Sequence, residues 1–148
     1  MQIKVMQVGQ LGTNCYLLED EETRTAAVVD PGGEGARILA QLKADGMELK
    51  LILLTHAHFD HTGGVAELCA ALPRVPVYLH PADAALVGGD VFPAVGAETT
   101  PYQDGDVVKL GKMDIEVLHT PGHTTGGVTM KVGDVLLSGD TLFQGSMG

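Results

Sequence analysis

A chain of 148 residues, with 45% hydrophobic and 19% charged residues, has the composition of one globular domain and not of a disordered segment. The net charge of −10 and the scatter of nine Lys and Arg residues argue against a nucleic-acid partner, because phosphate binding needs clustered basic groups. No apolar run approaches the roughly 20 residues of a membrane span. Lys4 and Gln7 interrupt any export signal, and Cys15 and Cys69 are expected to be reduced thiols, so we predict a cytoplasmic protein with no membrane partner.

The first half of the chain alternates strand-like and helix-like patterns, which is typical of a βαβ arrangement. The continuous apolar run LKLILLT is typical of a strand that is buried on both faces. Strands are expected at residues 3–8, 14–20, 25–30, 49–55 and 75–79, with an acidic turn at 19–23. Helices are expected at residues 34–46, 62–72 and 81–88, and Gly46 is expected to end the first of them.

The second half of the chain is predicted to be mostly β. Residues 88–105 show no clear period and are expected to form a long loop. Strand patterns return at residues 106–111, 113–120, 126–132 and 134–140. No low-complexity linker separates the two halves, so a single domain of α/β (α+β) class covering residues 1–148 is expected.

A dense cluster of metal-ligand residue types follows the apolar run at 49–55. His56, His58, Asp60 and His61 fall within six consecutive positions at H-x-H-x-D-H spacing. Crowded imidazoles and a carboxylate would repel one another on protonation or cost free energy to bury, unless a cation binds them. Imidazole nitrogens and carboxylate oxygens are the ligands that a Zn²⁺-class ion prefers. The cluster therefore predicts a metal site at the rim of a sheet.

Two later segments repeat the order of strand, tight turn and ligand-type residue. His123 lies in the loop sequence TPGHT after one expected strand, and Asp140 follows another in SGDTLF. Each is weak evidence alone, since an Asp after Gly is most often a turn residue. Both are nevertheless placed where they could complete the site.

The motifs THAHFDH, TPGHT and GDTLF, in this order and at this spacing, resemble the metallo-β-lactamase-fold hydrolase superfamily. Within it, the chain is most similar to the glyoxalase II-like (hydroxyacylglutathione hydrolase) branch, which VVDPGG at 28–33 and DGDVVKLG at 104–111 also resemble. The resemblance covers the whole chain. It implies a four-layer αββα sandwich in which each half of the chain supplies a sheet and its flanking helices.

The resemblance also implies a binuclear metal site, with two zinc ions in the family and iron or manganese as alternatives. One metal would be held by the imidazoles of His56, His58 and His123. The second metal would be held by Asp60 and His61, and the carboxylate of Asp140 would bridge the two. Asp30 would either orient a ligand through a hydrogen bond or simply form the turn before Pro31. His80 and His119 match no ligand position and are expected to be structural.

The chain departs from the family pattern near its C-terminus. The family places a further histidine ligand, more strands and covering helices beyond GDTLF, whereas this chain ends at Gly148. We therefore expect a truncated chain with an incomplete second half and an incomplete second metal site. An exposed sheet face would lower solubility or favour a homo-oligomer. The segment TTGG at 124–127 replaces the usual TPGS and would loosen the loop that holds His123.

By this resemblance, the expected function is metal-dependent hydrolysis, in which a metal-bound hydroxide attacks a small-molecule thioester such as an acylglutathione. Asp60 and Asp140 would be the catalytic carboxylates, holding the second metal and orienting the nucleophile. Substrate-binding residues are not identified. Two alternatives of the same fold are a mononuclear iron persulfide dioxygenase and a lactonase, and a phosphodiesterase is disfavoured by the negative charge. A third alternative is a metal-binding but inactive fragment or interaction module.

Overall fold

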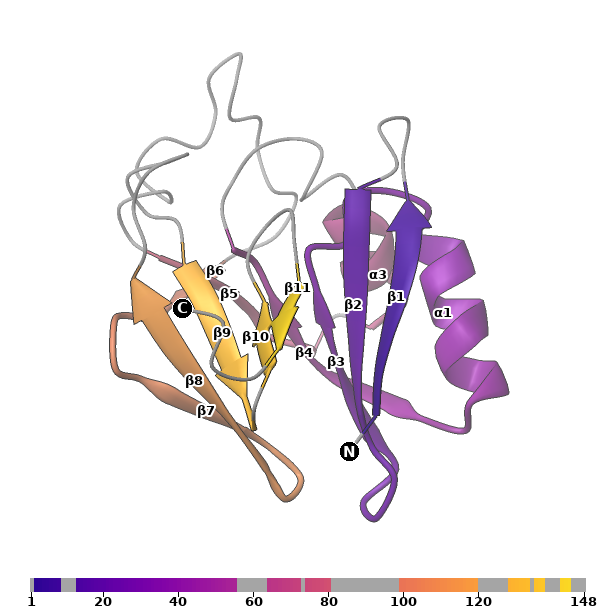
Figure 1. The fold of residues 1–148 in the computed structure, drawn as a ribbon. Coiled ribbons are helices and arrows are strands. Elements are labelled where there is room, and N and C mark those ends of the chain that lie inside the picture. The colour runs from indigo at the N-terminus through magenta and orange to yellow at the C-terminus, as the bar shows by residue number, and fades with distance from the viewer. Residues whose placement is uncertain are drawn as a thin grey trace, which may run out of the picture.

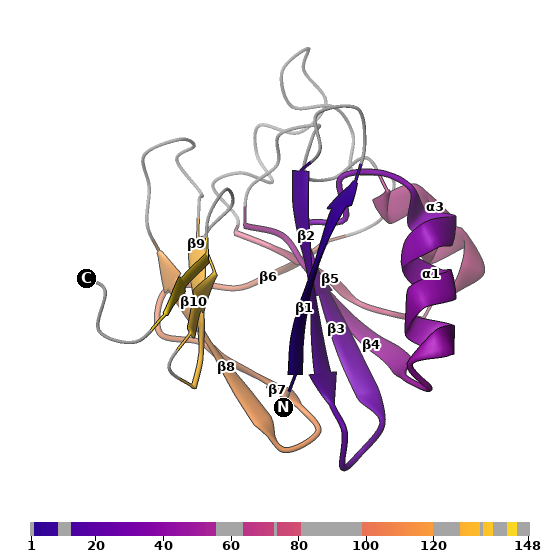
Figure 2. The same cartoon turned by 45° about the vertical axis from the view of Figure 1, so that its right-hand side comes forward.

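The structure is a computed structural model that describes residues 2–8, 13–55, 64–72, 74–80, 99–119, 128–133, 135–137 and 142–144. Within these ranges two β-sheets lie face to face, and two helices cover the outer side of the first sheet (Figures 1 and 2). The described residues therefore form three layers, in the order helix, sheet, sheet. These are three of the four layers expected for an αββα sandwich whose second half is incomplete.

The first sheet has six strands in sequence order: β1 (Gln2–Val8), β2 (Thr13–Asp20), β3 (Thr25–Val29), β4 (Glu48–Leu53), β5 (Val77–Leu79) and β6 (Thr99–Pro101). Strands β1 to β3 pair antiparallel, because short connections can only reverse the chain. From β3 to β6 the pairing is parallel. The carboxyl ends of β3, β4 and β5 consequently meet at one edge of the sheet.

Helices α1 (Gly35–Ala44) and α3 (Val65–Ala71) cover the outer face of this sheet (Figure 2). Each buries one apolar stripe, with Ile38 and Leu42 from α1 and Val65 and Leu68 from α3. The start of α3 lies close to the chain after β3, where Gly64 N–H donates to the Pro31 carbonyl at 2.7 Å. A Cβ at Gly64 would lie 2.9 Å from that oxygen, so a residue with a side chain could not approach Pro31 as closely.

The second sheet is antiparallel throughout, in the order β11–β10–β9–β8–β7: β7 (Val107–Leu110), β8 (Met113–His119), β9 (Val128–Val132), β10 (Val135–Leu137) and β11 (Leu142–Gln144). The inward residues of the two sheets pack together in one core: Tyr16, Leu18, Ala27, Val29, Leu51, Leu53, Tyr102, Leu110, Met113, Ile115, Val117, Val128, Met130, Val132 and Leu137. A separate core lies between the first sheet and the helices, and includes Leu17, Val28, Ile38, Ile52 and Leu68.

Two short strands were not predicted from the sequence. The long loop expected at 88–105 was wrong in part, because residues 99–101 form β6 and pair parallel with β5. Strand β11 lies in the GDTLF segment, beyond the expected strand at 134–140. The helix expected at 81–88 lies outside the described residues. The remaining predicted elements are present with ends shifted by a few residues, and α3 is described only from Val65.

Hydrogen bonds tie the two sheets together at both ends. At one end Lys112 N–H, in the β7–β8 turn, donates to Asp20 Oδ2 at 2.7 Å. At the other end Val128 N–H, at the start of β9, donates to the Thr55 carbonyl at 2.8 Å. The sheets are thus held in register by polar contacts as well as by their shared core.

Both cysteines are free, as the sequence predicted, and Cys15 is fully buried. Burial raises the pKa of the Cys15 thiol, so this side chain behaves as a small apolar core residue. Among the described residues, neither helix has the length and apolar character required to cross a bilayer.

Candidate metal centre

The predicted metal ligands His56, His58, Asp60, His61, His123 and Asp140 all lie outside the described residues. The structure instead describes the strands that lead into and out of the ligand-bearing segments. Strand β4 leads into the histidine cluster, β8 and β9 flank the segment with His123, and β10 and β11 flank the segment with Asp140. Within the described ranges, no group of three His, Cys, Asp or Glu side chains is placed to hold a metal ion.

Asp30 is the described residue that fixes the start of the histidine cluster. Its side chain is fully buried, and its two oxygens accept hydrogen bonds from Thr55, at 2.7 Å from the backbone N–H and 2.5 Å from Oγ1. Asp30 N–H in turn donates to the Leu53 carbonyl at 3.0 Å. Three hydrogen bonds therefore join the ends of β3 and β4, and His56 follows directly after Thr55.

Asp30 adopts a left-handed backbone conformation, with φ of 55°. A non-glycine residue in this region carries a cost of order 1–3 kcal/mol, which the surroundings must offset. Asp tolerates this conformation better than most residues, and here it aims the carboxylate at Thr55. These hydrogen bonds act on Thr55, the residue before the cluster, and not on a described ligand, so both roles considered for Asp30 stay predictions.

Thr55 is the functional residue that sequence reasoning missed. It is almost completely buried, and it is held from both sides by Asp30 and by Val128 at the start of β9. Its backbone carbonyl is the point where the first sheet contacts the second sheet at this edge. The signal in the sequence that could have indicated this residue is its place directly before His56. A buried hydroxyl needs a hydrogen-bond partner, and the buried carboxylate of Asp30 supplies one.

His80 and His119 meet at the same edge from opposite sheets. Their rings stack with centroids 4.2 Å apart and planes inclined by 14°. His80 follows β5 in the first sheet, and His119 is the last residue of β8, paired with Val128. Asp104 supports this arrangement by accepting a hydrogen bond from His119 N–H at 2.8 Å. Both imidazoles are half-buried, so the stack flanks the edge at which Thr55 lies.

The donor set of the sequence fits a divalent cation, because it combines imidazoles and carboxylates directly after buried strands. The described ends of β3 and β4 also fit a metal site, because buried hydrogen bonds from Thr55 to Asp30 fix the residue before the first histidine. The model of the metallo-beta-lactamase superfamily matches residues 8–148. The chain belongs to this superfamily. The fold agrees, with two facing sheets and helices outside the first.

Relatives of this metallo-beta-lactamase superfamily chain include enzymes named for hydrolysis. It is 37% identical over 161 residues to "Probable metallo-hydrolase YqgX" of Bacillus subtilis, covering 100% of this chain and 74% of that protein. It is 44% identical over 135 residues to the hydroxyacylglutathione hydrolase of Alkalilimnicola ehrlichii, covering 90% of this chain but 48% of that protein. The chain therefore spans about half the length of that hydrolase.

A solved structure shows the same fold with metal bound. The crystal structure of TTHA1623 in a di-iron-bound form has a TM-score of 0.79 and 39% sequence identity. The match covers 98% of this chain and 75% of that chain. The predicted fold class is thus confirmed.

Proposed function

We propose that this protein is a metal-dependent hydrolase of the cytoplasm whose substrate is a small thioester such as an acylglutathione. The observation that carries the proposal is the fixed position of Thr55, directly before the H-x-H-x-D-H donors. The similarity to a hydroxyacylglutathione hydrolase supports the thioester class. No residue of the described structure identifies the acyl group.

The residues that would hold the metal are those of the three motifs: His56, His58, Asp60, His61, His123 and Asp140. Divalent cations, zinc or alternatively iron or manganese, would lower the pKa of water from 15.7 to about 7 and so make hydroxide available at neutral pH. Asp60 and Asp140 would orient this nucleophile. Asp30 and Thr55 would act as positioning residues, since they fix the backbone that enters the first motif.

The test is metal analysis of the purified protein combined with an assay of acylglutathione hydrolysis. We expect bound metal and hydrolysis, and about two metals per chain would indicate that a second chain donates the remaining ligand of the second site. His58→Ala should lower the metal content and abolish hydrolysis. His80→Ala, which changes a histidine outside the donor set, should leave the metal content unchanged. Equal metal content in the native and His58→Ala proteins would contradict the ligand assignment.

Other outcomes of the same assay separate the alternatives. A single iron per chain together with oxygen consumption on a persulfide would identify a dioxygenase, and turnover of a lactone alone would identify a lactonase. About one metal without turnover of any of these substrates would identify a metal-binding module.

We also propose that a second copy of the chain covers part of the second sheet. No described helix lies on the outer face of this sheet (Figure 2). Leu118 and Leu136 are only partly buried there, and Val107 on the edge strand β7 is 52% exposed. Size-exclusion chromatography with light scattering tests this proposal, and a monodisperse monomer would refute it.

A further inference from the structure

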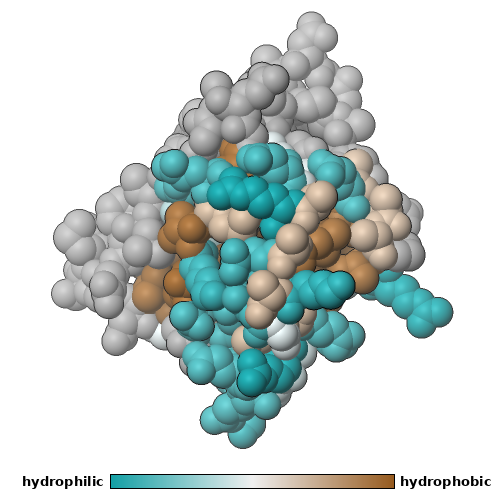
Figure 3. Space-filling model, turned by 90° about the vertical axis from the view of Figure 1, so that its right-hand side faces the viewer, coloured by the Kyte–Doolittle hydropathy of each residue, from teal (hydrophilic) through white to brown (hydrophobic). Residues whose placement is uncertain are grey.

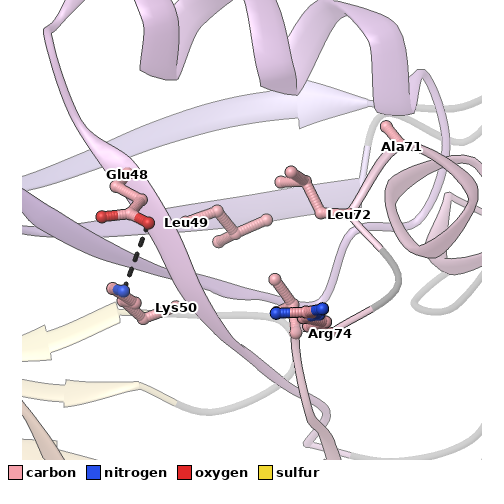
Figure 4. Close-up of a pocket in the computed structure, with 7 residues that line it drawn as sticks. Glu48, Leu49, Lys50, Ala71, Leu72 and Arg74 are labelled. Carbon is pink, nitrogen blue, oxygen red and sulfur yellow. Dashed lines mark ion pairs between the residues drawn. The ribbon is translucent and has the colours of Figure 1, made fainter.

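An apolar groove lies at the amino end of β4, at the opposite end of that strand from Thr55. It consists of two adjoining clefts of about 460 Å³ and 400 Å³, which share Glu48, Leu49 and Leu72. We name it the β4 groove. Leu49 and Leu72 point toward one another in the first cleft (Figure 4). The second cleft continues the apolar lining along α1 through Leu39, Leu42 and Met47.

The charge around the β4 groove is opposite to that of the whole chain. Three of the nine basic residues, Lys43, Lys50 and Arg74, line it. Among its described lining residues the acidic member is Glu48, which pairs with Lys50 at 3.2 Å. The lining therefore carries three positive charges and one negative charge, a surplus of two positive charges in a chain of net charge −10. A neutral apolar ligand does not need such a rim, whereas an anionic one is attracted by it.

The groove is an open depression whose apolar floor is buried. On the helix-bearing side of the molecule, apolar residues appear in patches between hydrophilic ones (Figure 3). Among the large hydrophobic residues of the groove, Leu72 is exposed, at 36%, whereas Leu42 and Leu49 are buried at its floor. Clefts of 300–1,000 Å³ are typical of small-molecule sites. A stable protein partner normally covers about 800 Å² of surface and would need a wider apolar patch.

We propose that the β4 groove binds an amphiphilic carboxylate, that is, a small molecule with an alkyl chain and one anionic head. The alkyl chain would pack between Leu49 and Leu72, because burial of apolar surface drives its transfer from water. The carboxylate would lie against Arg74, which lies beside the two leucines in Figure 4, while Lys50, paired with Glu48 at 3.2 Å, adds positive charge at the rim. The proposal does not depend on the hydrolase function, because the groove and the predicted metal centre lie at opposite ends of β4.

The test uses decanoate as the probe, below its micelle concentration, in a calorimetric titration of the full chain. Decyltrimethylammonium has the same alkyl chain with a positive head, and acetate has the head without the chain. We expect saturable binding of decanoate that is at least about tenfold tighter than that of decyltrimethylammonium. Acetate should show no saturable binding. Equal affinity for the two amphiphiles, or decanoate binding that appears only with micelles, would overturn the proposal.

Two pairs of matched variants locate the site. Lys50→Gln with Arg74→Gln should weaken decanoate binding about tenfold, whereas Lys109→Gln with Lys112→Gln, an equal charge change at exposed sites on the second sheet, should alter it less than about twofold. Leu72→Ser should also weaken binding about tenfold. Val107→Ser, at a more exposed apolar position outside the groove, should not.

Amide chemical shifts decide what occupies the groove. Decanoate should shift the amides of Leu49 and Leu72 and leave Val117 in the second sheet unchanged. Equal weakening by both double variants would overturn the proposal, as would shifts confined to other residues. A synthetic acidic amphipathic peptide that binds the same amides more tightly than decanoate would overturn it in favour of a protein-docking surface.

Discussion

Asp30 and Asp20 show one structural device used in two regions of the molecule. Both carboxylates are buried, and each accepts a backbone N–H at 2.7 Å from a residue distant in sequence. Asp30 holds Thr55 within the first sheet, directly before the predicted ligands. Asp20 holds Lys112, 92 residues away in the β7–β8 turn, and so ties one sheet to the other.

The comparison shows that a buried aspartate can position either the segment that precedes the predicted ligands or one β-sheet against the other. Hydrogen bonds from Lys112, Thr23 and Glu22 lower the pKa of Asp20. This carboxylate therefore contributes stability above its ordinary pKa, and the contribution is lost as the pH falls through its lowered value. Loss of Asp20 should affect folding alone, whereas loss of Asp30 should affect folding and metal binding together.

Asp30→Ala is expected to have the largest effect. It removes the carboxylate that accepts two buried hydrogen bonds from Thr55 and places alanine in a left-handed conformation, so the free energy of unfolding should fall by about 3–5 kcal/mol. Urea denaturation measures this change. Metal content, measured where the variant remains folded, should also fall.

Asp20→Ala is the matched variant, and it should cost about 2–3 kcal/mol while the metal content stays at the native value. An equal loss of metal in both variants would show that Asp30 acts only through overall stability. The comparison between the two aspartates would then fail.

A substitution at Gly111, which has φ of 56°, tests the contact between Asp20 and the β7–β8 turn more directly. A Cβ there would lie 2.3 Å from Thr23 Oγ1 and 2.5 Å from Asp20 Oδ2, well inside contact distance. Gly111→Ala should therefore cost about 2–4 kcal/mol. Gly105→Ala is the control, because Gly105 also has positive φ but its Cβ would meet nothing within 4 Å. It should cost only about 1–2 kcal/mol in thermal or urea unfolding. Equal costs would mean that conformational strain and not the Asp20 contact dominates.

The sequence predicted those parts of the fold that depend on local pattern. The continuous apolar run predicted β4, and the acidic turn at 19–23 predicted the β2–β3 hairpin. Strand β6 could not be predicted, since a three-residue strand with Pro101 carries no period and is stabilised by parallel pairing with β5. The bond from Lys112 to Asp20 was equally inaccessible, because it joins turns of two different sheets.

The candidate site likewise has features that the sequence predicts and features that only the tertiary structure shows. Donor types and spacing indicated the cluster from His56 to His61, because metal chemistry restricts the residues that can serve, whereas His123 and Asp140 were assigned through the family resemblance. The roles of Thr55 and Val128 needed the tertiary structure, since they arise from the contact between two sheets. The stacking of His80 on His119 likewise joins strands that are adjacent only in space.

A smaller effect is expected from Thr55→Val, which preserves shape and removes the hydroxyl that donates to Asp30. The free energy of unfolding should fall by about 1–2 kcal/mol, since the backbone hydrogen bond remains. Thr55→Ser retains the donor and should recover most of the hydrogen-bond contribution. If Thr55→Val and Thr55→Ser are equally destabilised in urea, packing of the methyl group contributes as much as the hydrogen bond.

The smallest effect concerns a third buried carboxyl, Glu19, which lacks the backbone donors of Asp20 and Asp30. Its Oε2 and Oδ2 of Asp45 are buried acceptors that find no donor unless one carboxyl keeps a proton. Lys4 lies 2.8 Å from Asp45 Oδ1 and favours the ionised form of Asp45. Burial, together with the hydrogen bond to Asp45, raises the pKa of Glu19 to about 7. Glu19 is therefore the group that retains the proton.

The pH dependence follows from this raised pKa. The stabilising contribution of protonated Glu19 is complete below its ordinary pKa and is lost as the pH rises through about 7. Between pH 5 and pH 8 this should lower the free energy of unfolding by on the order of 1 kcal/mol, after allowance for solvent screening. Glu19→Gln keeps a donor at every pH and should flatten the profile. A profile that stays as steep in Glu19→Gln would assign the dependence to another group.

The separation of the interior into two cores has a consequence for biosynthesis. A chain emerging from the ribosome presents its N-terminal part first, and the helix-side core draws all its members from residues 6–79. The opposite face of the first sheet, with Tyr16, Leu18 and Leu53, receives its cover only when β7 to β10 have been made. For that interval the nascent chain exposes a flat apolar surface. We expect this half-built state to be the one that chaperones bind and the one that aggregates when translation stalls.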